Sequence, residues 1–273
     1  MKLLEMFLVE TTEEDRAIIS LASALWHEAL KYKKKEVEPE PYYNDDFDDD
    51  GESIPDIEDP EEDETISLGK IGNLVDTPLQ KLKNVKIDLQ SDYGMRKEIK
   101  KAHNLDKIRE KGAYYGLWDP ESKTITLNRD LIDEPAVRSA VAHELRHALD
   151  DYKSNFKASS STRYSTPKDK SFRGVEKDPI YGDADYFARP EEINARFIEV
   201  LNSMVPKIRS AVKEVPPEQL RSYILAEFRD ALDFHHILKY FPQGAKSPDY
   251  KRLMKRGVDF IQKEIQHQLQ VKK

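Results

Sequence analysis

The order of apolar and polar residues divides the chain into segments of helical period and segments of strand period. Near the N-terminus, Ile18, Leu21, Leu25 and Leu30 recur at helical spacing, which predicts an amphipathic helix over residues 11–35. The segment closes on three lysines, and cations are favourable at a helix C-terminus because of the helix dipole.

The middle of the chain changes to a strand pattern. Residues 84–89 alternate like a short strand, and residues 95–111 have the pattern of a charged helix that ends before Gly112. Residues 114–118 and 124–128 are aromatic and β-branched runs, and the Asp, Pro, Glu and Ser between them are turn residues. These two runs predict a hairpin.

A helix is predicted directly after the hairpin. Asp133 is the expected N-cap, with Glu134 and Pro135 in the first turn, and the helix should run to about Tyr152. Its apolar stripe is formed by Val137, Val141, Leu145, Ala148 and Tyr152. This stripe is the expected core face.

The opposite face of the same helix carries a different set of residues. His143 and His147 project there beside the small Ala136 and Ala140, which leave room for a metal ion or a substrate. The two histidines are therefore not explained by burial in the core.

Further helices are predicted in the C-terminal half. Pro190 can begin one, and residues 191–204 have an apolar face. That face is formed by Ile193, Phe197, Val200, Leu201 and Met204. Residues 216–240 and 247–270 form two long amphipathic helices. The long Ser-, Thr- and Lys-rich segment 153–185 is a lid, a site of self-cleavage or a variable insertion.

These elements indicate an α+β protein with a small mixed or antiparallel sheet and a mainly helical C-terminal subdomain. The expected organisation is an N-terminal helix (1–35), an acidic linker or regulatory segment (36–65) and one larger domain (66–273). The larger domain divides into the sheet with its following helix (66–152) and a loop with the helical subdomain (153–273).

The charge of the chain is unevenly distributed. Sixteen acidic residues and no basic ones lie between Glu36 and Glu64, so the rest of the chain holds 44 positive and 36 negative charges. The acidic segment can therefore contact the basic body of the same chain. The basic final helix lacks interleaved aromatic residues, which disfavours a nucleic-acid partner.

The composition also limits the compartment and the ligand types. No run of about eighteen apolar residues is present, and Glu5 and Glu10 interrupt the N-terminal segment, so neither a membrane span nor a classical signal peptide is predicted. We expect a cytoplasmic protein, or a virion-associated one if a phage encodes it. Because the chain has no cysteine, a metal ion could be held only by His, Asp and Glu.

The strongest chemical signal is the motif H-E-x-x-H formed by His143, Glu144 and His147. Two histidines four residues apart lie one turn apart on a helix, so both imidazoles can reach one metal ion. By chance the motif is expected only about 0.02 times in a chain of this composition. A catalytic zinc ion generally has three protein ligands, which leaves one more to find.

The third ligand is sought on the helix that begins at Pro190. Glu192 projects from a face other than the apolar one, together with Arg196 and Glu199. Its neighbour Glu191 points about 100° away and remains an alternative. Either acid could instead be an ordinary first-turn residue favoured by the helix dipole.

Two short blocks resemble known zinc peptidases. The residues of HELRHALDDY, from His143 to Tyr152, are similar to the active-site helix of the thermolysin-like metallopeptidases, and Glu192 followed by Ala195 resembles the third-ligand helix of the wider glutamate-zincin group. The resemblance implies a zincin fold, a single zinc ion and peptide hydrolysis. It also suggests Asp151 as a residue that orients a histidine, and residues 124–128 as a substrate-binding edge strand.

Together these observations predict a zinc metalloendopeptidase that acts on a protein or peptide, with His143, His147 and Glu192 as metal ligands and Glu144 as general base. The sequence as a whole also resembles those of phage-encoded peptidases. Tyr186, His235 and His236 are candidates for stabilising the oxyanion, and the sequence does not choose among them. The alternative is a non-catalytic structural or interaction protein built on a zincin fold, such as a virion component.

Overall fold

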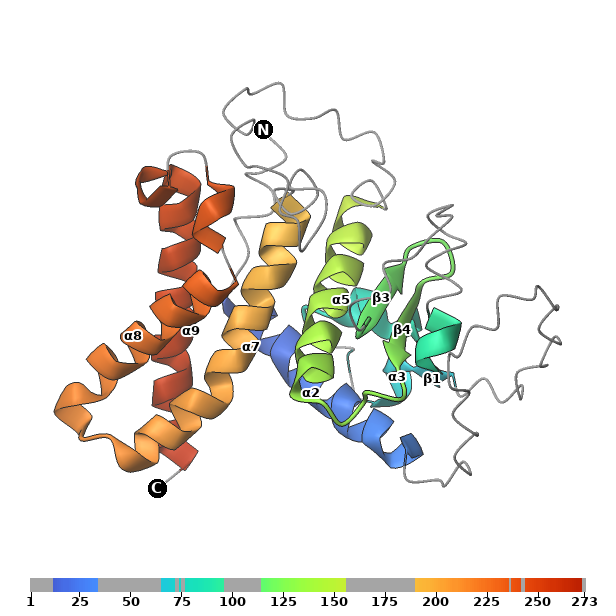
Figure 1. The fold of residues 1–273 in the computed structure, drawn as a ribbon, viewed down its shortest axis with the longest axis horizontal. Coiled ribbons are helices and arrows are strands. Elements are labelled where there is room, and N and C mark those ends of the chain that lie inside the picture. Colours follow the sequence, from blue (N-terminus) through green and yellow to red (C-terminus); the bar gives the residue numbers. More distant parts are fainter. Residues whose placement is uncertain are drawn as a thin grey trace, which may run out of the picture.

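The computed structural model shows a mainly helical protein with one small sheet, an α+β architecture (Figure 1). The residues that it describes are 12–33, 65–71, 74, 77–95, 114–155, 190–235, 237–241 and 244–271. The acidic segment, nearly all of the helix predicted at 95–111 and the segment 156–189 lie outside these residues.

The sheet has four strands in the order β1-β2-β4-β3. They are β1 (Ile66–Ser67), β2 (Lys86–Gln90), β3 (Gly116–Asp119) and β4 (Thr124–Asn128). β1 pairs with β2 and β3 with β4 in antiparallel fashion, whereas β2 and β4 are parallel. The predicted hairpin is confirmed, with Lys123 closing its turn at a positive φ of 57°.

The resemblance to zincins suggested residues 124–128 as an edge strand, and this expectation is wrong. β4 lies inside the sheet, because β2 and β3 flank it on opposite sides. All of its residues after Thr124 are buried, which agrees with an interior position. Among the strands that the structure describes, β3 lies at the edge next to β4.

Two of the predicted helices follow the expected pattern closely. α2 (Thr12–Lys33) matches the expected N-terminal helix, and α5 (Pro135–Ser154) matches the helix after the hairpin. The four aliphatic residues of the apolar stripe on α5 are buried, and Tyr152 packs against the core. The N-cap is Glu134 rather than Asp133, because the residue before a proline is restricted to an extended backbone.

Three long helices complete the chain. They are α7 (Pro190–Glu214), α8 (Pro217–Phe234) and α9 (Pro248–Val271), with η3 (Ile237–Tyr240) and η4 (Gly244–Lys246) between the last two. The apolar face predicted on α7 is buried throughout. α8 ends earlier than expected because the chain turns after Phe234, which brings Ile237 into the core and Phe241 against Tyr250.

The arrangement of the helices places α7 between α5 and α9, as Figure 1 shows. α2 packs against all three of them, and the short α3 (Leu68–Ile71) and η1 (Gln80–Asn84) contact each other beside the sheet. One apolar cluster extends from α2 through the sheet to α9. Among the described helices, none is long and apolar enough to cross a membrane.

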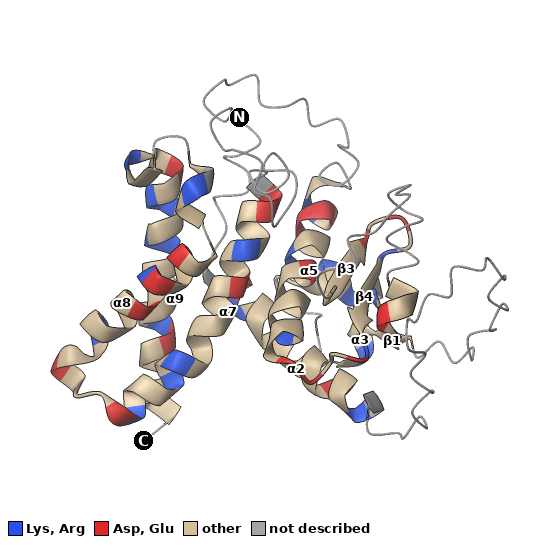
Figure 2. Ribbon diagram, in the orientation of Figure 1, with Lys and Arg blue, Asp and Glu red and all other residues tan. Residues whose placement is uncertain are grey.

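Charged residues of both signs alternate along the C-terminal helices (Figure 2). Acidic and basic side chains are mixed on α7, α8 and α9 rather than separated into large patches of one sign. The described surface of these three helices therefore carries charges of both signs, as is typical of a solvated surface.

Candidate metal centre

Two adjacent helices bring three potential metal ligands together. α5 supplies His143 and His147, and α7 supplies Glu192. The two Nε2 atoms are 2.9 Å apart, and Glu192 Oε2 lies 3.6 Å from that of His143 and 3.4 Å from that of His147. The sequence predicted this set, and the structure brings all three side chains to one point.

The separations of these atoms fit a small metal ion. Three atoms at such distances from one another lie about 1.9 Å from their common centre, close to the ~2.0–2.1 Å of zinc–nitrogen and zinc–oxygen bonds. In addition, Glu192 Oε2 is buried and has no hydrogen-bond partner in the structure. Because a buried carboxylate oxygen without a hydrogen bond is costly, its position facing two imidazoles fits a cation between them.

Glu192 is held so that its two oxygens differ. Arg196 lies one turn further along α7, and its Nε donates to Glu192 Oε1 at 3.0 Å. This contact leaves Oε2 facing the histidines. Glu191, the alternative from sequence, is also buried but is not part of the ligand cluster among the described residues.

A second acid on α7 approaches the other side of His143. Glu199 Oε1 lies 2.8 Å from His143 Nδ1, and Glu199 Oε2 lies 3.3 Å from His235 Nδ1. A carboxylate at Nδ1 favours a proton on that nitrogen and leaves the Nε2 lone pair for a metal ion. Glu199, rather than Asp151, is therefore the acid that lies against Nδ1 of His143 in the described residues.

Asp151 has a different described partner. Its Oδ2 accepts a hydrogen bond of 2.7 Å from Trp118 Nε1, which joins α5 to the end of β3. Among the oxyanion candidates, His235 lies against Glu199, which itself contacts His143. Tyr186 and His236 lie outside the described residues.

The electrostatics of the site couple the acids to the imidazoles. Burial disfavours the charged form of His143, yet Glu192 and Glu199 outweigh it and raise the His143 pKa well above 6.5. Burial likewise favours the neutral form of both acids. His143 and His147 nevertheless hold the pKa of Glu192 well below 4.5. His143 and His235 lower the pKa of Glu199 to about 2. Both acids are therefore anionic at neutral pH, as ligands and orienting groups for a cation must be.

Glu144 behaves differently from the other two acids. It is buried beside the ligand histidines, and burial raises its pKa, although His143 and His147 counteract the shift. A carboxylate with a raised pKa is a better proton acceptor than an ordinary one. Its side chain lies against β3, where a Cβ on Gly116 would come within 3.1 Å of Glu144 Cγ.

The sequence predicted the three candidate ligands but indicated no role for Arg196 and Glu199. Both lie on the same face of α7 as Glu192, four and seven residues further along, and this spacing was the available signal. It could not indicate which of the two would contact the histidine helix, because that depends on how α7 packs against α5.

Comparisons of the chain with protein-family models, curated proteins and solved structures found no match.

Proposed function

We propose that this protein is a zinc-dependent metalloendopeptidase of the zincin type. The observation that carries the proposal is the convergence of His143, His147 and a buried oxygen of Glu192 that has no hydrogen bond, with Glu144 next to them. Two imidazoles and one carboxylate are a typical donor set for catalytic zinc, which keeps a fourth position for water or substrate.

The neighbouring side chains support this choice of metal. Neutral imidazole and carboxylate ligands suit zinc, and Glu199 at His143 Nδ1 is the kind of second-layer contact that fixes a ligand histidine. When bound, zinc lowers the pKa of a coordinated water to about 7 and polarises a carbonyl group.

Glu144 has the properties of the general base in such a site. It is adjacent to His143 in sequence but turned about 100° away on the helix, so it flanks the ligands rather than joining them. Its raised pKa suits it to accept the proton of the attacking water and later to give that proton to the leaving amine.

The edge of β3 offers a position for the substrate. β3 lies at the edge of the described sheet, and its first residue, Gly116, packs against Glu144. An extended peptide that added to β3 as a further strand would pass beside Glu144 with its carbonyl groups in fixed register. This geometry favours cleavage within an extended segment of a protein.

The proposal can be tested with Glu144→Gln, which retains the size of the side chain and removes the base. After reconstitution with zinc, we expect one bound ion in both wild type and variant, and cleavage of an unfolded protein or a peptide library by the wild type alone. The loss should be about 10²–10⁴-fold or more, the usual contribution of a general base. Glu134→Gln, at the exposed start of the same helix, should cleave like the wild type.

The possible outcomes separate the alternatives. Zinc binding without cleavage of any substrate by the wild type would favour a non-catalytic zincin scaffold. Equal cleavage by wild type and Glu144→Gln would contradict the role of Glu144, and a wild type that binds no zinc would contradict the metal site.

A further inference from the structure

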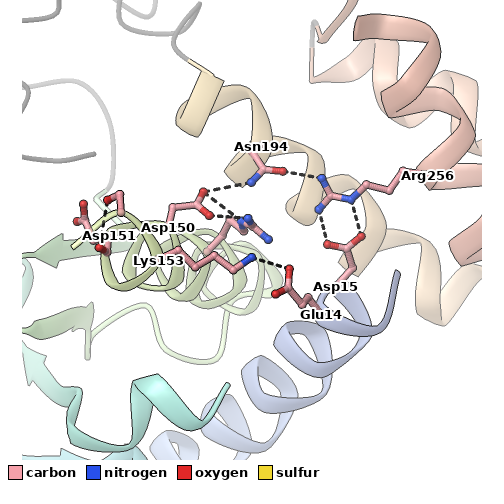
Figure 3. A network of polar contacts seen from close by, with 9 residues as sticks. Glu14, Asp15, Asp150, Asp151, Lys153, Asn194 and Arg256 are labelled. Carbon is pink, nitrogen blue, oxygen red and sulfur yellow. Dashed lines mark hydrogen bonds and ion pairs between the residues drawn. The ribbon is translucent and has the colours of Figure 1, made fainter. Parts of the chain in front are cut away.

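A buried polar network joins four helices, two of which carry the candidate metal ligands (Figure 3). Its members are Asp15 on α2, Arg256 on α9, Asn194 on α7, and Asp150 and Arg146 on α5. None of these side chains belongs to a residue more than 6% exposed. The proposed chemistry uses none of them, so their burial requires another explanation.

The network consists of two ion pairs and one amide between them. Arg256 donates through Nε and Nη2 to the two carboxylate oxygens of Asp15, the first bond being 2.6 Å long. Arg146 pairs in the same way with Asp150, at 3.1 and 2.5 Å. Asn194 Oδ1 accepts from Arg256 at 2.7 Å, and Asn194 Nδ2 donates to Asp150 at 3.1 Å.

The members of the network alternate with the metal ligands along the helices. Arg146 precedes His147, and Asp150 lies three residues beyond it. Asn194 lies two residues beyond Glu192, about 200° further round α7. Both side chains nevertheless reach α5, Glu192 toward the two histidines and Asn194 toward Asp150, and Asn194 also binds Arg256 of α9.

Stability alone gives little reason for such a network. Replacing a buried ion pair by apolar residues of similar volume is often neutral or stabilising, because desolvation costs about as much as the attraction gains. Hydrogen bonds are directional, however, whereas apolar contacts are not. A metal site needs its ligands within about 0.2 Å of the right distances. Directional bonds can hold the rotation of α7 about its axis, and its position along that axis, to this tolerance.

We propose that Asn194, together with the two ion pairs that it joins, is a positioning residue that sets α7 so that Glu192 meets the histidines of α5. This inference rests on the proposed metal centre. Arg256 and Asp15 bring α9 and α2 into the same arrangement, so the geometry of the metal ligands depends on two helices that supply none of them.

The test uses the full chain and two variants matched in residue type and burial. Asn194→Leu breaks the link and leaves each arginine with its carboxylate. Asn202→Leu, on the same helix, removes another buried amide, which donates to the Arg138 carbonyl oxygen at 3.3 Å. We expect the zinc Kd of Asn194→Leu to rise about 10–100-fold, as for other outer contacts of metal ligands. The cobalt(II) absorption spectrum should change with it, whereas both properties should be unchanged in Asn202→Leu.

A third variant separates positioning from folding. Asp15→Leu combined with Arg256→Met removes one ion pair without leaving a buried charge, so we expect a folded protein about as stable as the wild type. It should still bind zinc more weakly. If the wild type binds zinc and both this variant and Asn194→Leu bind it with unchanged Kd and spectrum, the inference is wrong. If the wild type binds no zinc, the proposed function itself fails.

Discussion

At the scale of single residues, the candidate site contains four acids with different contacts. Glu192 faces the Nε2 atoms of the two histidines, and Glu199 lies against Nδ1 of His143. Glu144 lies beside the histidines, and Asp151 accepts a hydrogen bond from Trp118. The H-E-x-x-H motif predicted the place of Glu144 because helical spacing is local, whereas Glu192 was expected from the pattern of the helix that begins at Pro190 and its resemblance to the third-ligand helix of zincins. It could not assign Glu199 and Asp151 their roles, because these depend on which helix packs against which face.

The role of Glu199 leads to a prediction about zinc affinity. Glu199→Gln removes the negative charge beside His143 Nδ1, so the imidazole becomes a weaker and less well oriented ligand. We expect the zinc Kd to rise about 10–100-fold in competition with a chromophoric chelator. Glu227→Gln, which only breaks a surface pair with Lys207, is the control and should bind like the wild type. Unchanged affinity in Glu199→Gln would contradict the orienting role.

At the scale of elements, periodicity predicted which segments are helices and strands, and tertiary contacts decided where several of them end. The pattern gave α2, α5 and the hairpin almost completely. It placed the end of α8 too late. The resemblance to zincins placed the edge of the sheet on β4, whereas the pairing of β2 with β4 across 33 intervening residues puts β4 inside the sheet. No local pattern contains that pairing.

The contact between β3 and α5 leads to a prediction about activity. A Cβ at Gly116 would lie 3.1 Å from Glu144 Cγ and 3.4 Å from Leu127 Cδ2, so Gly116→Ala should displace the flexible Glu144 side chain. Because a shift of about 1 Å can cost up to about 10²-fold in rate, we expect a loss of about 10-fold or more in peptidase activity with zinc content unchanged. The measurement is a peptidase assay with metal analysis.

The control for this variant is Gly94→Ala, whose new Cβ would meet no atom closer than 3.4 Å. It should leave the rate unaltered. Full activity in Gly116→Ala would mean that Glu144 does not depend on the space beside β3.

At the scale of the whole molecule, the candidate metal centre depends on residues from both ends of the chain. Arg256 and Asp15 are 241 residues apart in sequence, yet they form a buried pair beside the helices that hold the ligands. Composition and periodicity predicted an α+β protein and a helical C-terminal part. They could not predict this pairing, since it requires the packed arrangement of α2, α7 and α9.

The central claim is that Glu192 completes a zinc site with His143 and His147. The most direct measurement compares zinc binding by the wild type, Glu192→Gln and Glu191→Gln, two neighbouring buried acids on one helix. We expect one zinc ion per chain in the wild type and in Glu191→Gln, and a loss of affinity of more than about 100-fold in Glu192→Gln. Wild-type affinity in Glu192→Gln, or a wild type without zinc, would contradict the account.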